Sequence, residues 1–179
     1  LNPDVVVVAT GPRLVMPDIP GIEAPWVRTA WEVFSAKLKG PEPTVVIGEE
    51  GVACEAALML RERRIEVTLL APSNQLARDV EPVTRRALLT LLEREGVRVR
   101  AGVTVERIGD HQVFGRDAAG NGISLKAGLV VVTPRLDGDH SLTTALEAAG
   151  VPVHAVGDCV EPGAVDAAIH AATEVAISL

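Results

Sequence analysis

Residues 43–73 constrain the fold more than any other stretch, because they read as a strand, a glycine turn, a helix and a second strand. Residues 44–47 form a short, β-branched apolar run that ends at Gly48. Apolar side chains recur at helical spacing through residues 52–59, and residues 65–70 return to strand composition. This order predicts a βαβ unit, whose first turn directs backbone N–H groups outward at a helix N-terminus.

The glycine turn matches the pattern of a dinucleotide-binding turn only in part. That pattern places glycine at three positions, for a tight turn, for close approach of a diphosphate to the main chain, and for packing of helix on strand. Aligned on Gly48, the second position is Glu50 and the third is Ala53. The third position tolerates a methyl group. We expect the Glu50 carboxylate to take the space of a diphosphate and to repel it.

A second departure lies at the end of the second strand, where an acidic residue normally accepts hydrogen bonds from the adenine ribose hydroxyls. Ala71 stands at this position. Two interpretations remain open. Either the turn prefers a 2′-phosphorylated cofactor, whose phosphate would contact Ser73, Asn74 or Arg78, or it binds no cofactor at all.

Composition narrows the classes of function. A length of 179 residues, with 47% hydrophobic and 23% charged residues, suits one large or two small globular domains. No apolar run is long enough to span a membrane, and residues 1–11 lack the features of a secretory signal, so we expect a cytoplasmic protein. A net charge of −7 and 2% aromatic residues argue against nucleic-acid binding.

Metal and thiol chemistry are not expected. Cys54 and Cys159 are far apart in sequence and form no C-x-x-C pair. The histidines lack the paired spacing of zinc ligands, and surface or locally hydrogen-bonded roles are expected for them: His111, His140, His154 and His170. The sequence therefore predicts no metal site and no catalytic residue.

The remaining elements follow from apolar spacing and from turn residues. Strands are expected at residues 5–9, 129–133 and 153–156, and helices at 29–38, 81–95, 139–149 and 164–179. The first of these strands is expected to be covered on both faces, and Trp31 and Phe34 are expected to point inward. Residues 97–105, 112–116 and 123–126, with the hairpin pair Asn121-Gly122, predict a three-stranded antiparallel element.

Gly157 and Asp158 directly follow the last predicted strand and precede a loop and a helix. A carboxylate at such a place accepts hydrogen bonds from sugar hydroxyls, while helix N–H groups face a phosphate. A plain loop with a helix cap is the alternative. The pair is therefore a candidate site for a ribitol or a phosphate.

Three segments together resemble one family pattern: VVVVATG with PDIPG near the start, VVIGxxxxxCEAA in the middle and HAVGDCVEP near the end. The chain resembles the C-terminal FAD/NAD(P)-binding region of the NADH:flavin oxidoreductase family, which includes 2,4-dienoyl-CoA reductase and trimethylamine dehydrogenase and has a pyridine nucleotide-disulfide oxidoreductase-like fold. The resemblance implies an α/β protein: a Rossmann-like three-layer NAD(P)-type domain with an antiparallel β-meander, plus the partial half of an FAD domain. Residues 1–27 and 138–179 would form the FAD part, and residues 28–137 the inserted domain.

The resemblance also implies roles for particular residues. Thr10 and Gly11 would lie at the hinge near FAD, Gly157 and Asp158 would meet the flavin ribitol and diphosphate, and the backbone of Cys159 and Val160 would lie beside them. The nucleotide turn of the inserted domain would comprise Gly48, Gly51, Val52, Ala53 and Glu55, with Glu50 and Ala71 as the departures and Ser73 beyond the second strand.

The family places a further glycine fingerprint before the first of these segments and, earlier still, a barrel that carries FMN and an iron–sulfur cluster. The resemblance therefore implies that this chain is a fragment or a subunit. A polypeptide carrying the rest of the FAD domain, and the barrel, would be its partner, and the uncovered edge of the half domain would be apolar.

Three functions are open at this point. The first is part or subunit of a flavin-dependent oxidoreductase that completes an FAD site and carries a degenerate NAD(P)H-binding domain. The second is a non-catalytic scaffold, or a docking subunit for an electron carrier. The third is an independent protein that binds an adenine nucleotide such as ADP.

Overall fold

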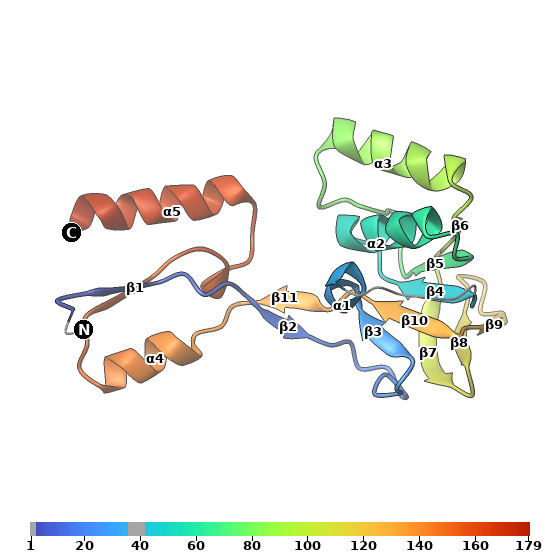
Figure 1. Cartoon of the computed structure of the whole chain (residues 1–179), viewed down its shortest axis with the longest axis horizontal. Helices are drawn as coiled ribbons and strands as arrows, with labels where there is room; N and C mark the ends of the chain where they lie inside the picture. The colour runs from blue at the N-terminus through green and yellow to red at the C-terminus, as the bar shows by residue number, and fades with distance from the viewer. Residues whose placement is uncertain (1–2, 36–41) are drawn as a thin grey trace. The chain divides into compact units, whose positions relative to one another are not determined.

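The computed structural model describes residues 3–35 and 42–179 and divides the chain into two compact units (Figure 1). Unit 1 comprises Leu1–Pro17 and Pro134–Leu179, and unit 2 comprises Asp18–Thr133. Unit 2 is therefore an insertion into unit 1, and the chain passes between them twice. The assignment of residues 1–27 and 138–179 to an FAD domain, and of 28–137 to an NAD(P)-type domain, stays a prediction.

A five-stranded parallel sheet forms the centre of unit 2. Its strand order is β3-β10-β4-β5-β6, with β3 Val27–Thr29, β10 Leu129–Val132, β4 Thr44–Ile47, β5 Val67–Ala71 and β6 Arg98–Ala101. Helix α2, Gly51–Glu62, connects the neighbouring parallel strands β4 and β5. The predicted βαβ unit is thus confirmed.

The strands of this sheet are buried on both faces because their side chains alternate between two cores. Val46 and Leu69 pack with α1 Ala30–Ser35, α2 and α3 Pro82–Arg94. Val45 and Leu70 pack with a second set of apolar side chains from three antiparallel strands, β7 Thr104–Gly109, β8 Gln112–Arg116 and β9 Gly122–Lys126. Figure 1 shows the helices α2 and α3 on one side of the sheet and the meander on the other. The three-layer α/β fold with a meander is confirmed.

The boundary between sheet and meander differs from the prediction. Residues 97–105 were expected to be one strand of the antiparallel element, but β6 belongs to the parallel sheet and β7 begins only at Thr104. Gly102, with φ +69°, lies between them and allows the chain to turn. Alternating β-branched residues suit both kinds of sheet, so composition alone did not reveal the break.

Helix α1 begins at Ala30, and residues 36–38 of the helix predicted at residues 29–38 lie outside the described residues. Thr29 and Glu32 form a reciprocal cap: the Thr29 N–H donates to the Glu32 carboxylate at 2.6 Å, and the Glu32 N–H donates to Thr29 Oγ1 at 3.2 Å. Trp31 packs against the helix-side core, as expected. Phe34 is 37% exposed, so the prediction that it points inward is wrong.

Glu81 caps the N-terminus of α3 and provides a pH-dependent contribution to stability. Its carboxylate accepts hydrogen bonds from the Thr84 and Val83 N–H groups, both at 3.0 Å, and these bonds lower the pKa of Glu81. Because the pKa is lower in the folded state, this stabilisation is present above the ordinary pKa of a glutamate and is lost as pH falls through the folded-state value.

We expect Glu81→Gln to lower the free energy of unfolding at about pH 7 and to lower it less at about pH 3, because the stabilisation by the wild-type carboxylate is lost as pH falls through its folded-state pKa. Urea unfolding of both proteins at the two pH values measures this. An equal difference between variant and wild type at both pH values would contradict the role of the charge.

Unit 1 contains two short strand pairs and two helices. β1 Val6–Val8 pairs in parallel with β12 Val153–Ala155, and β2 Arg13–Val15 pairs antiparallel with β11 Arg135–Asp137. Helix α4 is Ser141–Ala148, the 3₁₀ turn η1 is Gly157–Cys159, and helix α5 is Val165–Ser178. Figure 1 shows α4 and α5 on opposite sides of the β1-β12 pair. This arrangement places η1 between the last strand and the last helix.

Much of the apolar surface of unit 1 is uncovered in the described chain. No residue of α4 or α5 is buried, and Val165, Ile169 and Ile177 of α5 are 76%, 62% and 81% exposed. In β1, Val8 is 2% exposed but Val7 is 47% exposed. The expectation that this strand is covered on both faces is therefore wrong here, because Val7 remains about half exposed in the described structure although helices lie on both sides of the β1-β12 pair. Among those residues, no helix combines the length and the apolar content needed to cross a bilayer.

Candidate functional site

The Gly157-Asp158 turn of unit 1 lies at the carboxyl ends of the parallel strands β1 and β12, beside a cavity of about 410 Å³. Gly157 has φ +71°, a conformation that favours glycine and that turns the chain sharply out of the strand. The lining consists mainly of small side chains: Ala9, Gly11, Val156, Gly157, Asp158, Gly163, Val165, Ala168 and Ala172. Ligands of open parallel sheets bind at this end of the strands.

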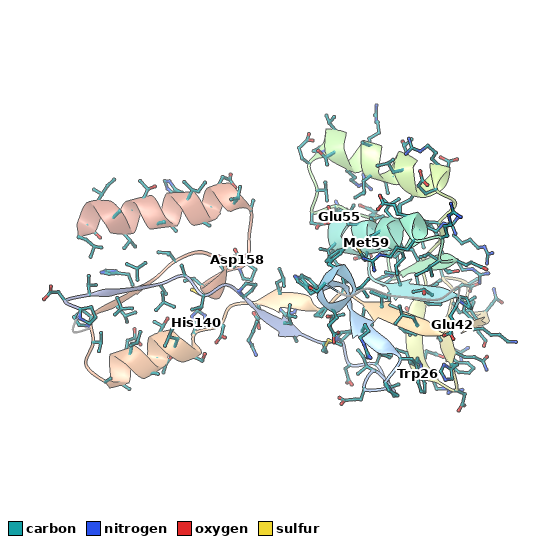
Figure 2. All side chains as sticks on the ribbon, viewed as in Figure 1. Trp26, Glu42, Glu55, Met59, His140 and Asp158 are labelled. Carbon is teal, nitrogen blue, oxygen red and sulfur yellow. The ribbon has the colours of Figure 1, made fainter. Side chains whose placement is uncertain are left out.

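Asp158 is the acidic side chain of this cavity. Its Oδ1 accepts a hydrogen bond from the Gly163 N–H at 3.3 Å, which directs the carboxylate across the loop that leads to α5. Figure 2 shows Asp158 between the end of β12 and the start of α5. An ionised carboxylate accepts several hydrogen bonds, so acceptor capacity remains for a hydroxyl group in the cavity.

The structure brings most of the predicted unit 1 residues together. Gly11, Gly157 and Asp158 line the cavity, and Val160 lines an adjoining one of about 420 Å³. Cys159 is fully buried beneath the turn, where its thiol contacts the Val156 and Val8 carbonyl oxygens at 3.2 and 3.4 Å. Thr10 is exposed and is not part of the cavity lining.

Sequence reasoning did not identify Gly138, whose backbone packs closely against this turn. A Cβ on Gly138 would lie 2.5 Å from the Val160 carbonyl oxygen and 3.1 Å from that of Cys159. Glycine at this position therefore allows the two stretches of backbone to approach closely. A glycine followed by two polar residues between a strand and a helix carries no signal of that contact.

The second candidate is the glycine turn of unit 2, between β4 and α2. A Cβ on Gly48 would overlap the Thr133 hydroxyl oxygen and would lie 3.0 Å from the Ala53 methyl carbon. Ala53 is fully buried. Gly48 and Ala53 thus serve the tight turn and the helix packing that the dinucleotide pattern requires.

Glu50 turns its carboxylate toward the ends of β4 and β10. Its Oε2 accepts hydrogen bonds from the Thr133 hydroxyl at 2.9 Å and from the Glu49 N–H at 3.1 Å. Glu50 is the N-cap residue of α2, but its side chain makes no capping hydrogen bond. The prediction that Glu50 obstructs a diphosphate stays a prediction.

Asp79 caps α2 instead. Its Oδ1 and Oδ2 lie 2.9 and 3.1 Å from the Gly51 nitrogen, across 28 positions of sequence. The Glu49 carboxylate accepts the Ser73 N–H at 2.9 Å in the same way. Sequence spacing did not predict these contacts of Asp79 and Glu49, because they form only when the loop after β5 folds back over the start of α2.

The other residues predicted for this turn differ in their burial and in their contacts. Glu55 is exposed on α2, where Figure 2 labels it together with Met59 one helical turn later. Val52 is partly buried in the helix-side core. The Ser73 hydroxyl accepts the Gln75 N–H at 3.1 Å, and Ala71 is fully buried.

Cys54 lies within the first turns of α2 and is fully buried. Burial, followed by the negative charges of Asp79, Glu50 and Glu55, raises the pKa of its thiol to about 12. The thiol therefore stays protonated and unreactive at neutral pH. Among the described residues, no group of three or more His, Cys, Asp or Glu side chains is arranged to hold a metal ion.

The two candidate sites differ in how well they fit a dinucleotide. The unit 1 cavity combines small lining residues with a carboxylate acceptor, which suits a ribitol and its adjoining phosphate. In unit 2, the Gly51, Glu49 and Ser73 N–H groups already donate to carboxylates of the chain. A diphosphate at these N–H groups would have to displace the carboxylates.

The fold and the two glycine turns define a protein of the Rossmann type, in which a parallel sheet carries a dinucleotide turn at its carboxyl edge. Residues 1–160 match the family described as pyridine nucleotide-disulphide oxidoreductase, and the chain belongs to that family. The family is a class of oxidoreductase flavoproteins with FAD- and NAD(P)-binding folds of this kind.

Two similar proteins of known activity cover nearly the whole chain. An NADH oxidase of Thermoanaerobacter brockii is 31% identical over 98% of this chain and 28% of its own length. A bilirubin reductase of Mediterraneibacter gnavus (strain CC55_001C) is 32% identical over 91% of this chain and 25% of its own length. The chain therefore spans about a quarter of each of these relatives.

A solved structure of 2-naphthoyl-CoA reductase in complex with 2-naphthoyl-CoA superposes with a TM-score of 0.90 at 27% identity. The match covers 99% of this chain and 27% of that protein. A histamine dehydrogenase from Rhizobium sp. 4-9, with a TM-score of 0.81 at 17% identity, shares the fold.

Proposed function

We propose that this chain is part of a flavin-dependent oxidoreductase of the NADH:flavin oxidoreductase type, in which unit 1 completes an FAD site and unit 2 is the NAD(P)-type domain. The observation that carries the proposal is the cavity beside Asp158, with its small lining residues and its carboxylate acceptor. Bound FAD would supply the redox chemistry, namely electron transfer between a nicotinamide and the flavin. No side chain of this chain is required as an acid or a base.

The residues at the cavity would bind and orient the cofactor. Asp158 would accept hydrogen bonds from ribitol hydroxyls, and Gly11 and Gly157 would allow close approach to the main chain. Helix α5 begins after Ala164, which makes no side-chain cap, and Ala164 and Ala167 line the adjoining cavity. N–H groups at a helix N-terminus would favour a phosphate there. The backbone of Cys159 and Val160 would lie beside the diphosphate.

The partner in this proposal is a polypeptide region that carries the rest of the FAD domain and a flavin-bearing barrel, in the same polypeptide or in a second one. Two observations support it. The apolar side chains of α5 and β1 are uncovered in unit 1, and the relatives extend well beyond the matched region. An additional layer over α5 would remove Val165 and Ile169 from water.

A second candidate function is a non-catalytic scaffold or docking subunit whose inserted domain binds no nucleotide. The carboxylates on the Gly51, Glu49 and Ser73 N–H groups favour it. It differs from the first candidate in one measurable respect, which is bound flavin.

We expect the full-length protein to carry FAD and Asp158→Ala to weaken FAD binding by roughly tenfold to a hundredfold, because a charged hydrogen-bond acceptor is lost. Flavin absorbance per protein and titration of the apoprotein with FAD measure this effect. Glu147→Ala, which removes an exposed carboxylate of α4, is the matched control. A wild-type protein without flavin, or unchanged FAD affinity in Asp158→Ala, would reject the FAD site and leave the second candidate.

A further inference from the structure

We propose that the Asp79 carboxylate occupies the place of a diphosphate at the N-terminus of α2, and that this residue, more than Glu50, weakens the binding of a pyridine nucleotide to unit 2. The inference rests on the proposed function in one respect, the assignment of unit 2 as the NAD(P)-type domain. It adds a residue that determines the binding specificity of that domain for a nucleoside diphosphate.

The first step is the hydrogen bonding of the turn. A dinucleotide turn binds its diphosphate through backbone N–H groups at the start of the helix. Here both Asp79 carboxylate oxygens lie within 3.1 Å of the Gly51 nitrogen, the first residue of α2. A phosphate oxygen at this N–H would have to replace the carboxylate.

The second step is the placement of the loop that carries Asp79. The Ala77 N–H donates to the Glu49 carbonyl oxygen at 2.5 Å, and Arg85 Nε donates to the Leu76 carbonyl oxygen at 2.6 Å. A Cβ on Gly51 would overlap Val80 Cγ2, so the residue after Asp79 packs directly on the start of the helix. The carboxylate is therefore positioned by packing and by hydrogen bonds on both sides, although its side chain is exposed to solvent.

The third step is the local charge. Asp79, Glu50 and Glu55 all raise the pKa of the Cys54 thiol, after burial itself, and Arg85 opposes them. The carboxylates that act on this thiol therefore outnumber the one guanidinium that does. A diphosphate would add negative charge to this region, where repulsion weakens its binding.

The fourth step distinguishes the effect of the Asp79 carboxylate on ligand binding from that of the Glu50 carboxylate. The Glu50 carboxylate bonds the Thr133 hydroxyl and the Glu49 N–H, so removing it leaves the bond between Asp79 and Gly51 in place. Removing the Asp79 carboxylate frees the Gly51 N–H directly. The two substitutions therefore have different expected effects on a ligand that binds through that group.

The test is calorimetric titration of the full-length protein with ADP, which carries the diphosphate without a nicotinamide. We expect Asp79→Ala to bind ADP about tenfold or more tightly than wild type, Glu50→Gly alone to change the affinity by less than about threefold, and the double variant to bind most tightly. Asp79→Asn retains an acceptor and loses the charge, so an intermediate gain is expected. Glu62→Ala, which removes an exposed carboxylate at the far end of α2, is the control for charge alone.

A second readout reports the contact itself. Amide hydrogen exchange at Gly51 should be faster in Asp79→Ala than in wild type, and it should slow when ADP is added. Unchanged ADP affinity in Asp79→Ala with faster exchange at Gly51 would overturn the proposal, as would full recovery of binding by Glu50→Gly alone. Unchanged exchange at Gly51 would also overturn it, because the contact would then be absent.

These experiments distinguish failure of the proposed role of Asp79 from failure of the proposed FAD site. All the variants leave the cavity beside Asp158 unaltered, so differences in ADP binding among them report on unit 2. Tighter ADP binding by Asp79→Ala in a protein without flavin would reject the proposed FAD site and support the role of Asp79.

Discussion

Leu69→Ala is expected to lower the free energy of unfolding of unit 2 by about 2–5 kcal/mol. Leu69 is fully buried in strand β5 and belongs to the core between the sheet and the helices α1–α3. Truncation removes its apolar contacts and leaves a cavity that a sheet paired on both sides of β5 cannot close.

Urea unfolding followed by tryptophan fluorescence measures this loss, because both tryptophans of the chain, Trp26 and Trp31, lie in unit 2. Val83→Ala is the control, since Val83 is 76% exposed on α3 and its truncation should change stability by less than about 0.5 kcal/mol. Similar losses in the two variants would show that the core of unit 2 is not packed as described.

Gly21→Ala is expected to destabilise unit 2 by roughly 2–4 kcal/mol. Gly21 is the last residue of the PDIPG segment and has φ +88°, where an L side chain is strained. A Cβ there would also overlap the Ile108 carbonyl oxygen, next to the bond that the Ile108 N–H donates to the Pro20 carbonyl at 2.8 Å. The substitution thus combines backbone strain with a clash against the end of β7.

Gly120→Ala separates these two effects. Gly120 has φ +84°, but a Cβ there would have no neighbour within 4 Å. Its loss should be about 1–2 kcal/mol, from backbone strain alone. Equal losses for Gly21→Ala and Gly120→Ala, measured by the same fluorescence transition, would contradict the proposed contact between the PDIPG turn and β7.

The elements of unit 2 followed closely from local sequence pattern. The strand at Thr44–Ile47, the turn at Gly48 and the helix at residues 81–95 were predicted because each depends on residues that are neighbours in sequence. The break at Gly102 and the exposure of Phe34 were not predicted. Both depend on which surface the chain packs against, and composition does not carry that information.

The sequence by itself determined the α/β class and the βαβ unit, since periodicity and glycine positions act within a few residues. It also indicated the Gly157-Asp158 turn as a candidate site. Only the tertiary structure decided which carboxylate caps α2. The contact between Asp79 and Gly51 spans 28 positions, and that between Thr133 and Glu50 spans 83. Both arise because sheet order and a folded-back loop bring distant residues to one edge of the sheet, and neither separation follows a period that a sequence displays.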